Sequence, residues 1–265
     1  MAALLEVQGV TVRFGGLTAL ADVSATVGDS EVVGVIGPNG AGKTTLFNVV
    51  CGFTRPTEGT LRWQGSGLRR HQPRQLAALG IARTLQGLGL FPHLTVLENV
   101  MTGATKESRS WFWSALFALP RSDGDEARLR DRALAVLREL DVVETADRLP
   151  GQLPYGVQKR VSLARALVAE PRLLLLDEPA SGLSSEEMGE LGRMIRELRG
   201  RMSVILVEHH MDLVMQVCDR IVVLDFGRTI ATGTPDEVRD DPRVMEAYLG
   251  EQVDAQTGEV GDAGD

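Results

Sequence analysis

Residues 37 to 45, Gly-Pro-Asn-Gly-Ala-Gly-Lys-Thr-Thr, constrain the fold more than any other stretch of the chain. The apolar run Glu31–Ile36 precedes them and Leu46–Val50 follows, so the pattern predicts a strand, a glycine loop and a helix. Glycines let the backbone wrap closely around a phosphate chain, and the N–H groups that open a helix attract anions. A glycine-rich turn without a ligand would not explain the spacing together with both flanks. The stretch therefore predicts a phosphate-binding loop.

The residue types in this loop indicate how a nucleotide would be held. Lys43 would reach the β- and γ-phosphates, and the Thr44 hydroxyl would bind Mg²⁺, which makes ATP and Mg²⁺ the expected cofactors. The residues expected to surround the phosphates are Gly37, Pro38, Asn39, Gly40, Ala41, Gly42, Lys43, Thr44 and Thr45.

Composition excludes several classes of protein. A net charge of -8 over 265 residues argues against a nucleic-acid partner held by a general basic field. The only cysteines, Cys51 and Cys218, lie far apart in apolar settings and are expected to be buried thiols of a reducing compartment. No apolar run approaches the ~18 residues that span a bilayer, and the N-terminus lacks the features of a signal peptide. We expect a cytoplasmic protein whose membrane association comes through a partner.

The first third of the chain predicts a β-rich layer around the loop. Leu4–Val12 and Ala19–Val27 have strand character, and Phe14 lies in the turn between them. Phe14 could stack on an adenine ring or be an ordinary core residue. Further on, Ile81–Gln86 is expected to be a short strand ending on an amide. The Gln86 carbonyl could bind Mg²⁺ or orient water, although an isolated Gln at a strand end is usually polar surface.

The middle of the chain changes from strands to helices. From Val96 to about Leu149 helical patterns dominate, and Asp125–Leu140 repeats apolar residues at helical spacing. We expect a helical subdomain here. Within it, Trp111–Leu119 is either a core-facing amphipathic turn or a docking surface for a membrane partner.

The second half returns to alternating helices and strands. A helix is expected from Gln158 to Glu170, and the apolar run Leu173–Leu176 then ends in Asp177 and Glu178. Ligands bind at the carboxyl ends of buried parallel strands, so Asp177 is expected to hold Mg²⁺ and Glu178 to polarise the attacking water as a general base. The alternative is an acidic turn without a ligand.

A second strand ending carries histidines. The strand Ser203–Val207 is followed by Glu208, His209 and His210, and a histidine at that end of the sheet can reach a γ-phosphate. The two short strands expected next, on either side of a turn at 225–228, precede one or two short helices over Pro235–Leu249.

The order of these motifs resembles that of the nucleotide-binding subunit of an ABC transporter, from about Leu4 to Gly250. Within that family the chain is most similar to the ATPase subunits of branched-chain amino-acid uptake systems. The closer similarity depends on residues 14–17 (Phe-Gly-Gly-Leu), 83–86 (Arg-Thr-Leu-Gln), 90–92, 95–99 and 241–250.

The resemblance implies a fold and a division of the chain. The fold is an α/β P-loop NTPase of the RecA-like kind, with a parallel-sheet core, an N-terminal antiparallel β layer and an inserted α-helical subdomain. Residues 1–95 and 158–250 would form the ATP-binding core, and 96–157 the helical subdomain that ends in the signature motif. Residues 251–265, which offer little to bury, are expected to be a disordered tail.

The resemblance also implies roles for single residues. Phe14 would stack on adenine, Gln86 would couple the nucleotide state to the membrane subunits, and Asp177 would be the second Mg²⁺ anchor. Glu178 would be the catalytic base and His209 the switch histidine. His210 occupies a position where these proteins usually carry Asp.

Two motifs depart from the family pattern. The signature, usually Leu-Ser-Gly-Gly-Gln, reads Leu-Pro-Tyr-Gly-Val at residues 153–157, so Pro154 offers neither a hydroxyl nor an N–H to the phosphate. The N–H groups from Tyr155, Gly156 and Val157 remain as donors. The second departure is Ser184, which stands where Asp or Asn is common. Since ATP lies between one subunit's loop and the other's signature, we expect a heterodimer, with tolerated sequence drift as the alternative.

These features together predict an ATPase subunit that drives uptake of branched-chain amino acids or related small solutes. Its partners would be a second ABC ATPase, two membrane permeases and, indirectly, an extracytoplasmic solute-binding protein, at the cytoplasmic face of the membrane. The alternatives are urea or amide uptake, lipid or polysaccharide export, a soluble ABC protein of translation or DNA maintenance, and a small-molecule kinase. The soluble ABC proteins carry two cassettes or a long coiled coil, which this sequence lacks.

Overall fold

The computed structural model describes residues 3–68, 71–84, 87–104 and 123–248. It divides into two compact units, which are considered separately here. Unit 1 comprises Met1–Pro73 and Arg199–Asp265, and unit 2 comprises Arg74–Leu198. The expectations for Gln86, for Trp111–Leu119 and for the tail at 251–265 lie outside the described residues. The expected subdomain at 96–157 stays a prediction.

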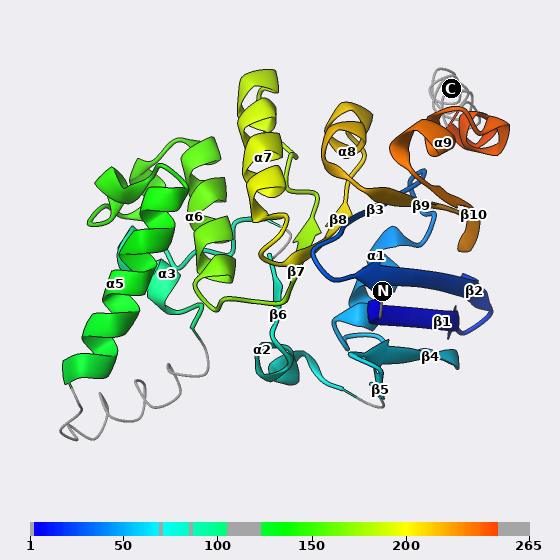
Figure 1. The fold of residues 1–265 in the computed structure, drawn as a ribbon, viewed down its shortest axis with the longest axis horizontal. Helices are drawn as coiled ribbons and strands as arrows, with labels where there is room; N and C mark the ends of the chain where they lie inside the picture. Colours follow the sequence, from blue (N-terminus) through cyan, green and yellow to red (C-terminus); the bar gives the residue numbers. More distant parts are fainter. Residues whose placement is uncertain (1–2, 69–70, 85–86, 105–122, 249–265) are drawn as a thin grey trace, which may run out of the picture. The chain divides into compact units, whose positions relative to one another are not determined.

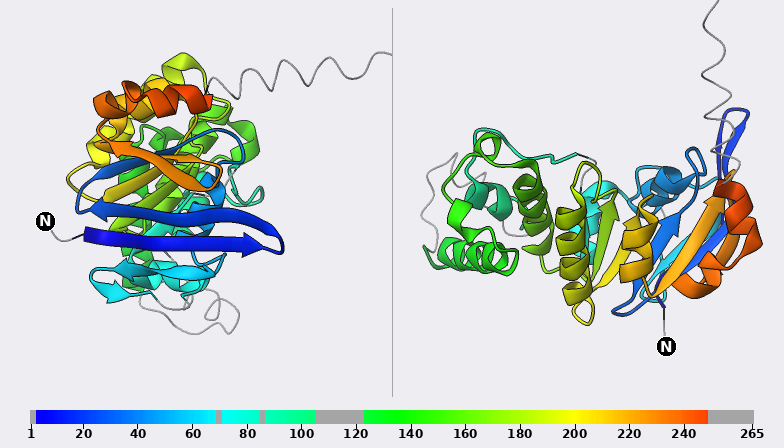
Figure 2. Two further views of the ribbon diagram at one scale, coloured as in Figure 1. Left: turned by 90° about the vertical axis from the view of Figure 1, so that its right-hand side faces the viewer. Right: turned by 90° about the horizontal axis from the view of Figure 1, so that it is seen from above.

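An antiparallel sheet forms one layer of unit 1. Its strand order is β2-β1-β4-β5, with bounds Leu17–Gly28, Ala3–Phe14, Glu58–Trp63 and Ser66–Gly67. The long hairpin of β1 and β2 is clear in Figure 2. The β-rich N-terminal layer is therefore confirmed. The turn is shorter than expected, because β1 continues to Phe14, which pairs with Leu17, and Gly15 takes a left-handed φ of 59°.

A second sheet of unit 1 carries the glycine loop. Its described order within the unit is β10-β9-β3-β8, where β3 pairs in parallel with both β8 and β9, and β10 closes the edge as an antiparallel hairpin. Strands β3 and β8 are buried at every residue, as parallel strands covered on both faces should be. The bounds are Val32–Ile36 for β3, Ser203–Val207 for β8, Arg220–Asp225 for β9 and Arg228–Gly233 for β10.

Helices cover this second sheet of unit 1 (Figure 1). Helix α1 (Lys43–Val50) contacts β2 and β8, and α8 (Met211–Val217) packs on β3. The packing of α8 requires Gly34, because a Cβ there would lie 2.9 Å from the Cys218 sulfur. Helix α9 (Pro235–Arg239) and a helix at 242–248 follow the last strand, as predicted. Cys51 and Cys218 are buried free thiols, as predicted.

Unit 2 combines a parallel strand pair with helices. Strand β6 (Ile81–Arg83) pairs with β7 (Leu173–Asp177), and the α3, α5 and α6 helices pack on one another (Figure 1). The helices are α2 (Leu76–Leu79), α3 (Val96–Met101), α5 (Asp123–Glu139), α6 (Tyr155–Leu167) and α7 (Ser185–Leu198). The expected helix Gln158–Glu170 was wrong at both ends. α6 begins at Tyr155, because Pro154 takes the N-cap position instead of breaking the helix, and it ends at Leu167, three residues before Glu170.

The predicted fold class is confirmed by parallel strands with helices, an antiparallel β layer and a helical cluster in unit 2. Among the described residues, no helix has the length and apolar content needed to cross a bilayer.

Candidate nucleotide-binding site

The glycine loop of unit 1 joins β3 to α1 and is supported from two sides. Gly37 has a φ of 147°, and a Cβ there would lie only 2.0 Å from the Leu224 carbonyl oxygen. Gly42, at φ 102°, caps α1 and leaves no room for a side chain beside Leu20. At Gly40, by contrast, a Cβ would meet nothing within 4 Å. The loop is thus fixed by strands β2 and β9 at its ends and is open in its middle.

A hairpin turn that the sequence did not connect with the loop also holds it. Gly227, between β9 and β10, donates its N–H to the Ala41 carbonyl at 3.0 Å. The Gly227 carbonyl in turn accepts the Ala21 N–H at 2.8 Å, which ties the turn to β2. The turn at 225–228 was predicted, but the contact between Gly227 and the loop was not, because nothing in local sequence spacing encodes it.

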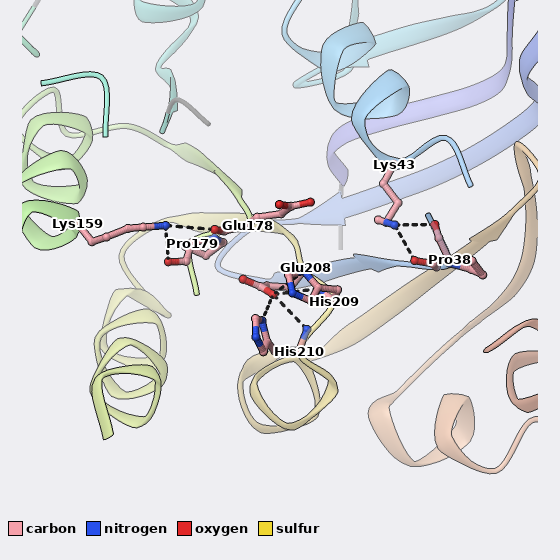
Figure 3. Close-up of polar contacts among 9 residues, drawn as sticks. Pro38, Lys43, Lys159, Glu178, Pro179, Glu208, His209 and His210 are labelled. Carbon is pink, nitrogen blue, oxygen red and sulfur yellow. Dashed lines mark hydrogen bonds and ion pairs between the residues drawn. The ribbon is translucent and has the colours of Figure 1, made fainter. Parts of the chain in front are cut away.

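Lys43 is 8% exposed and folds back over the loop (Figure 3). Its ammonium donates to the carbonyl oxygens of Gly37 at 2.6 Å and Pro38 at 2.8 Å. Lys43 also opens α1, whose first turn holds no acidic residue. A cation at the positive end of a helix dipole is unfavourable unless an anion compensates it. The loop therefore fits a bound phosphate chain, and the exposed Thr44 is accessible beside it.

The end of β8, also in unit 1, carries the predicted His209. Glu208 is fully buried, and its Oε2 accepts the N–H groups of His209 at 2.9 Å and His210 at 3.1 Å. The His210 Nδ1 lies 2.9 Å from the same oxygen. The His209 ring is half exposed and is thus available to a ligand. Because Val35 of β3 aligns with Val207 of β8, the loop and the histidines follow neighbouring strands at the same sheet edge.

Asp177 ends β7 in unit 2 and is the predicted metal-binding carboxylate. Its side chain is 2% exposed and pairs with the Arg83 guanidinium at 3.0 Å. Burial raises the pKa of Asp177, while Arg83 opposes that shift and the neighbouring Glu178 charge adds to it. A buried carboxylate that already has a cationic partner fits a site for a metal cation. Arg83 was quoted only for the family resemblance, and its pairing depends on β6 lying beside β7.

Glu178 follows with a left-handed φ of 47°, an uncommon conformation for a residue with a side chain. Lys159 of α6 supports this turn: its ammonium lies 3.4 Å from the Glu178 carbonyl oxygen and 3.1 Å from that of Pro179 (Figure 3). Lys159 thus holds the backbone and not the carboxylate. Sequence reasoning missed Lys159, although it is one of only three lysines in the chain.

The signature residues open α6. Pro154 is the N-cap, at φ -55° and ψ 152°, and Tyr155 is 42% exposed beside Gly182. A Cβ at Gly156 would lie 2.1 Å from a carboxylate oxygen of Glu187, so a side chain here would displace the Glu187 carboxylate at the start of α7. Ser184 and Glu187 form hydrogen bonds that cap α7, with Ser184 Oγ and Glu187 Oε2 2.9 Å apart.

A pocket within unit 2 brings several of these groups together. Asp177, Gly156 and Lys159 line it with Thr84 and Glu187, and the apolar wall includes Leu163, Leu176, Leu191 and Met194. The signature helix, the start of α7 and the predicted metal ligand therefore share one cavity.

Phe14 ends β1 and is 53% exposed. The alternative of an ordinary core phenylalanine is therefore wrong. Stacking of Phe14 on adenine stays a prediction.

Comparisons with known proteins agree with this organisation. A family model described as ABC transporter matches residues 20–181, and a model described as branched-chain amino acid ATP-binding cassette transporter matches residues 228–254. The solved ADP conformation of MJ1267, an ATP-binding cassette of an ABC transporter, superimposes with a TM-score of 0.82 at 29% identity, covering 95% of this chain and all of that one.

Three relatives match over 250 residues, which is 94% of this chain and 98% of each relative. The high-affinity branched-chain amino acid transport ATP-binding proteins BraF of Pseudomonas aeruginosa and LivG of Escherichia coli are 42% and 41% identical. The lipopolysaccharide export system ATP-binding protein LptB of Haemophilus influenzae is 33% identical. With the phosphate loop, the strand ends and the signature helix in place, this chain belongs to the ABC transporter family and is one of its nucleotide-binding, ATP-hydrolysing subunits.

Proposed function

We propose that this chain powers the uptake of branched-chain amino acids or related small solutes through partner permeases. The observation that carries the substrate class is the match of residues 228–254 to the branched-chain amino acid cassette model. That region, which begins at β10, lies outside the match to the general ABC transporter model, which ends at residue 181. The higher identity to BraF and LivG than to LptB supports the same conclusion.

Each unit carries residues that we assign to nucleotide binding or hydrolysis. In unit 1, Lys43 and the loop backbone would bind the β- and γ-phosphates, Phe14 would stack on adenine, and His209 would donate to the γ-phosphate. Residues 37–45 form a loop that is held at both ends and open in the middle, so the phosphate contacts need little reorganisation.

In unit 2, Glu178 would accept a proton from the attacking water as the general base. The proposed Mg²⁺ ligands are Asp177 and Gln86 in unit 2 and Thr44 in unit 1; Mg²⁺ would neutralise phosphate charge.

The partner would be a second, different ABC ATPase, and two permeases would anchor the pair at the cytoplasmic face of the membrane. Tyr155 and Gly156 would contact the nucleotide held by that partner's loop, where Pro154 removes one hydrogen bond. To test asymmetry, both ATPases are purified and the catalytic Glu is replaced by Gln in each in turn. Unequal losses of turnover support a heterodimer with unequal sites, whereas equal losses leave Pro154 as tolerated drift.

The substrate class is tested by isolating the chain from its native membrane with a tag and identifying the permeases that accompany it. The complex is then reconstituted in proteoliposomes with its binding protein. We expect ATP-dependent uptake of radiolabelled leucine, which Glu178→Gln abolishes. Uptake of urea without leucine would assign the chain to the alternative importer class. Co-isolated permeases that extract lipopolysaccharide would assign it to export, which the 33% identity to LptB makes the nearest rival.

A further inference from the structure

The end of β8 holds an unusual group of potential metal ligands. Glu208, His209 and His210 are consecutive, and one ligand atom of each lies within 4.8 Å of the others. The nitrogen Nδ1 of His210 is 2.9 Å from Glu208 Oε2, and Nδ1 of His209 is 3.8 Å from it (Figure 3). The two imidazole rings are 4.1 Å apart between centroids. Three side chains that follow one strand therefore converge on a single point.

These separations suit a transition metal. A tetrahedral Zn²⁺ with bonds of about 2.0–2.1 Å places its ligand atoms about 3.3 Å from one another. The observed 2.9 Å and 3.8 Å lie on either side of that value, so small rotations of the rings would satisfy it. Nδ1 of His210 and Oε2 of Glu208 already lie within hydrogen-bond distance, and the same two atoms would hold the metal ion.

The buried Glu208 carboxylate should be a strong ligand, and the partly exposed histidines keep the site accessible. Glu208 is 0% exposed, so its interaction with a cation is weakly screened. The histidine side chains, 52% and 32% exposed, form the entrance. One carboxylate with two imidazoles favours Zn²⁺, Cu²⁺ or Ni²⁺ over Mg²⁺, which prefers oxygen ligands alone.

Within residues 3–68, 71–84, 87–104 and 123–248, Glu208–His210 is the one group of three His, Cys, Asp or Glu side chains close enough to hold such an ion. The other two histidines, His71 and His93, are separate in sequence, and His71 Nε2 already bonds the Val50 carbonyl at 2.9 Å. Both cysteines are buried, and burial raises the pKa of Cys218 to about 12, so its thiol does not ionise near neutral pH. Metal binding by the folded protein should therefore concentrate at Glu208–His210.

We propose that Glu208, His209 and His210 form an inhibitory site for a divalent transition metal. The bound metal engages the His209 side chain, which the proposed mechanism needs at the γ-phosphate. His210 supplies the second imidazole. The inhibitory effect rests on the proposed role of His209, but metal binding itself does not.

The test uses the full chain without nucleotide, titrated with ZnCl₂ in a non-chelating buffer by calorimetry. We expect one Zn²⁺ per chain, with affinity reduced at least about tenfold in His210→Asp and in His209→Gln. His93→Gln, which removes an exposed histidine elsewhere, should leave the affinity unchanged. X-ray absorption of the zinc-loaded protein should show two imidazole ligands. Thermal unfolding of each variant verifies that it is folded.

Hydrolysis provides a separate readout. Micromolar Zn²⁺ should inhibit ATP hydrolysis by the native chain, and His210→Asp should relieve that inhibition. Three outcomes would each overturn the proposal. The native chain could fail to bind zinc, His210→Asp could keep native affinity, or His93→Gln could lose as much affinity as His210→Asp. Binding with the expected variant order but no leucine uptake in proteoliposomes would instead count against the proposed transport function alone.

Discussion

Strands β7 and β8 are both five residues long and buried at every position, yet they deliver their carboxylates in different ways. Asp177 ends β7 and bonds to the side chain of Arg83, on a neighbouring strand. Glu208 follows β8 and bonds to the backbone N–H groups of the next two residues and to His210.

The difference separates an exchangeable carboxylate from a structural one. A guanidinium can move aside when a metal cation arrives, because its side chain has other rotamers. Backbone N–H groups cannot move without unfolding the turn, so Glu208 fixes the direction in which His209 and His210 leave the strand. The carboxylate of Asp177 at the end of β7 can therefore exchange its partner, whereas the carboxylate of Glu208 after β8 fixes the local backbone.

The largest expected effect is on the turnover number, at Glu178, which follows Asp177 at the end of β7. Glu178→Gln should lower kcat by about 10²-fold or more, because the general base is lost, while nucleotide affinity changes little. Steady-state hydrolysis and fluorescent-nucleotide binding measure the two quantities. Glu186→Gln, an exposed Glu in the first turn of α7, is the matched control and should retain native turnover. Normal hydrolysis by Glu178→Gln would show that the base lies elsewhere.

The same chemical change at the two ends should affect stability unequally. Glu208→Gln replaces a charged acceptor of several hydrogen bonds by a neutral one, and we expect a loss of about 2 kcal/mol in unfolding free energy. Asp177→Asn keeps a carbonyl oxygen that can accept from Arg83, and because burial raises the pKa of Asp177 its charge adds little to stability, so we expect a loss of within about 1 kcal/mol. Urea unfolding without nucleotide compares them. Equal losses would contradict the distinction between a structural and an exchangeable carboxylate.

Lys159 tests whether the turn at Glu178 must be held. Lys159→Met removes the ammonium that bonds the Glu178 and Pro179 carbonyls, so the base should be less well positioned. We expect kcat to fall about tenfold with little change in ATP affinity. Lys159→Arg, which keeps a donor of similar reach, should recover part of the loss. An equal loss in both variants would point to packing against Tyr155, which the ammonium also faces at 5.4 Å, as the cause.

The smallest expected effect is on the pH dependence of stability. Because the folded pKa of Asp177 is raised, its contribution to stability is present below its ordinary pKa and lost as pH rises through the folded value. Arg83→Met removes an interaction that lowers this pKa, so the loss should extend to higher pH. Urea midpoints of Arg83→Met should thus decline from pH 4 towards neutrality more than those of the double variant Arg83→Met with Asp177→Asn. Parallel curves would show that Asp177 does not titrate in this range.

Sequence reasoning located elements correctly where their position is encoded locally. The loop at 37–45 and the carboxylates after Leu173–Leu176 each follow a short apolar strand directly. The end of such a strand can be read from the sequence, so the positions of these residues at the sheet edge could be predicted. The β layer and the short terminal helices were found for the same reason. The start of α6 was misjudged, because Pro and Gly near a helix start resemble breakers, although proline is well tolerated there.

Partners across the fold were not predictable in this way. Arg83 meets Asp177 only because β6 lies beside β7, and Gly227 meets Ala41 only because the β9–β10 turn reaches the loop. Gly156 was assigned to phosphate contact, and the structure adds a packing constraint from Glu187 that no spacing rule contains. These residues depend on strand order and helix packing, which single-sequence patterns leave open.

Lys159 belongs to α6, the helix that begins with the signature, yet its ammonium donates a hydrogen bond to the Glu178 carbonyl oxygen in the turn after β7. In the pair of cassettes proposed above, that helix would contact the partner's nucleotide, while the turn would serve this chain's own site. The Lys159 side chain would thus connect the helix of one proposed site with the turn of the other. If the two proposed sites are coupled through Lys159, hydrolysis at one should depend on the contact made at the other, and the contact that Pro154 weakens should slow turnover at both.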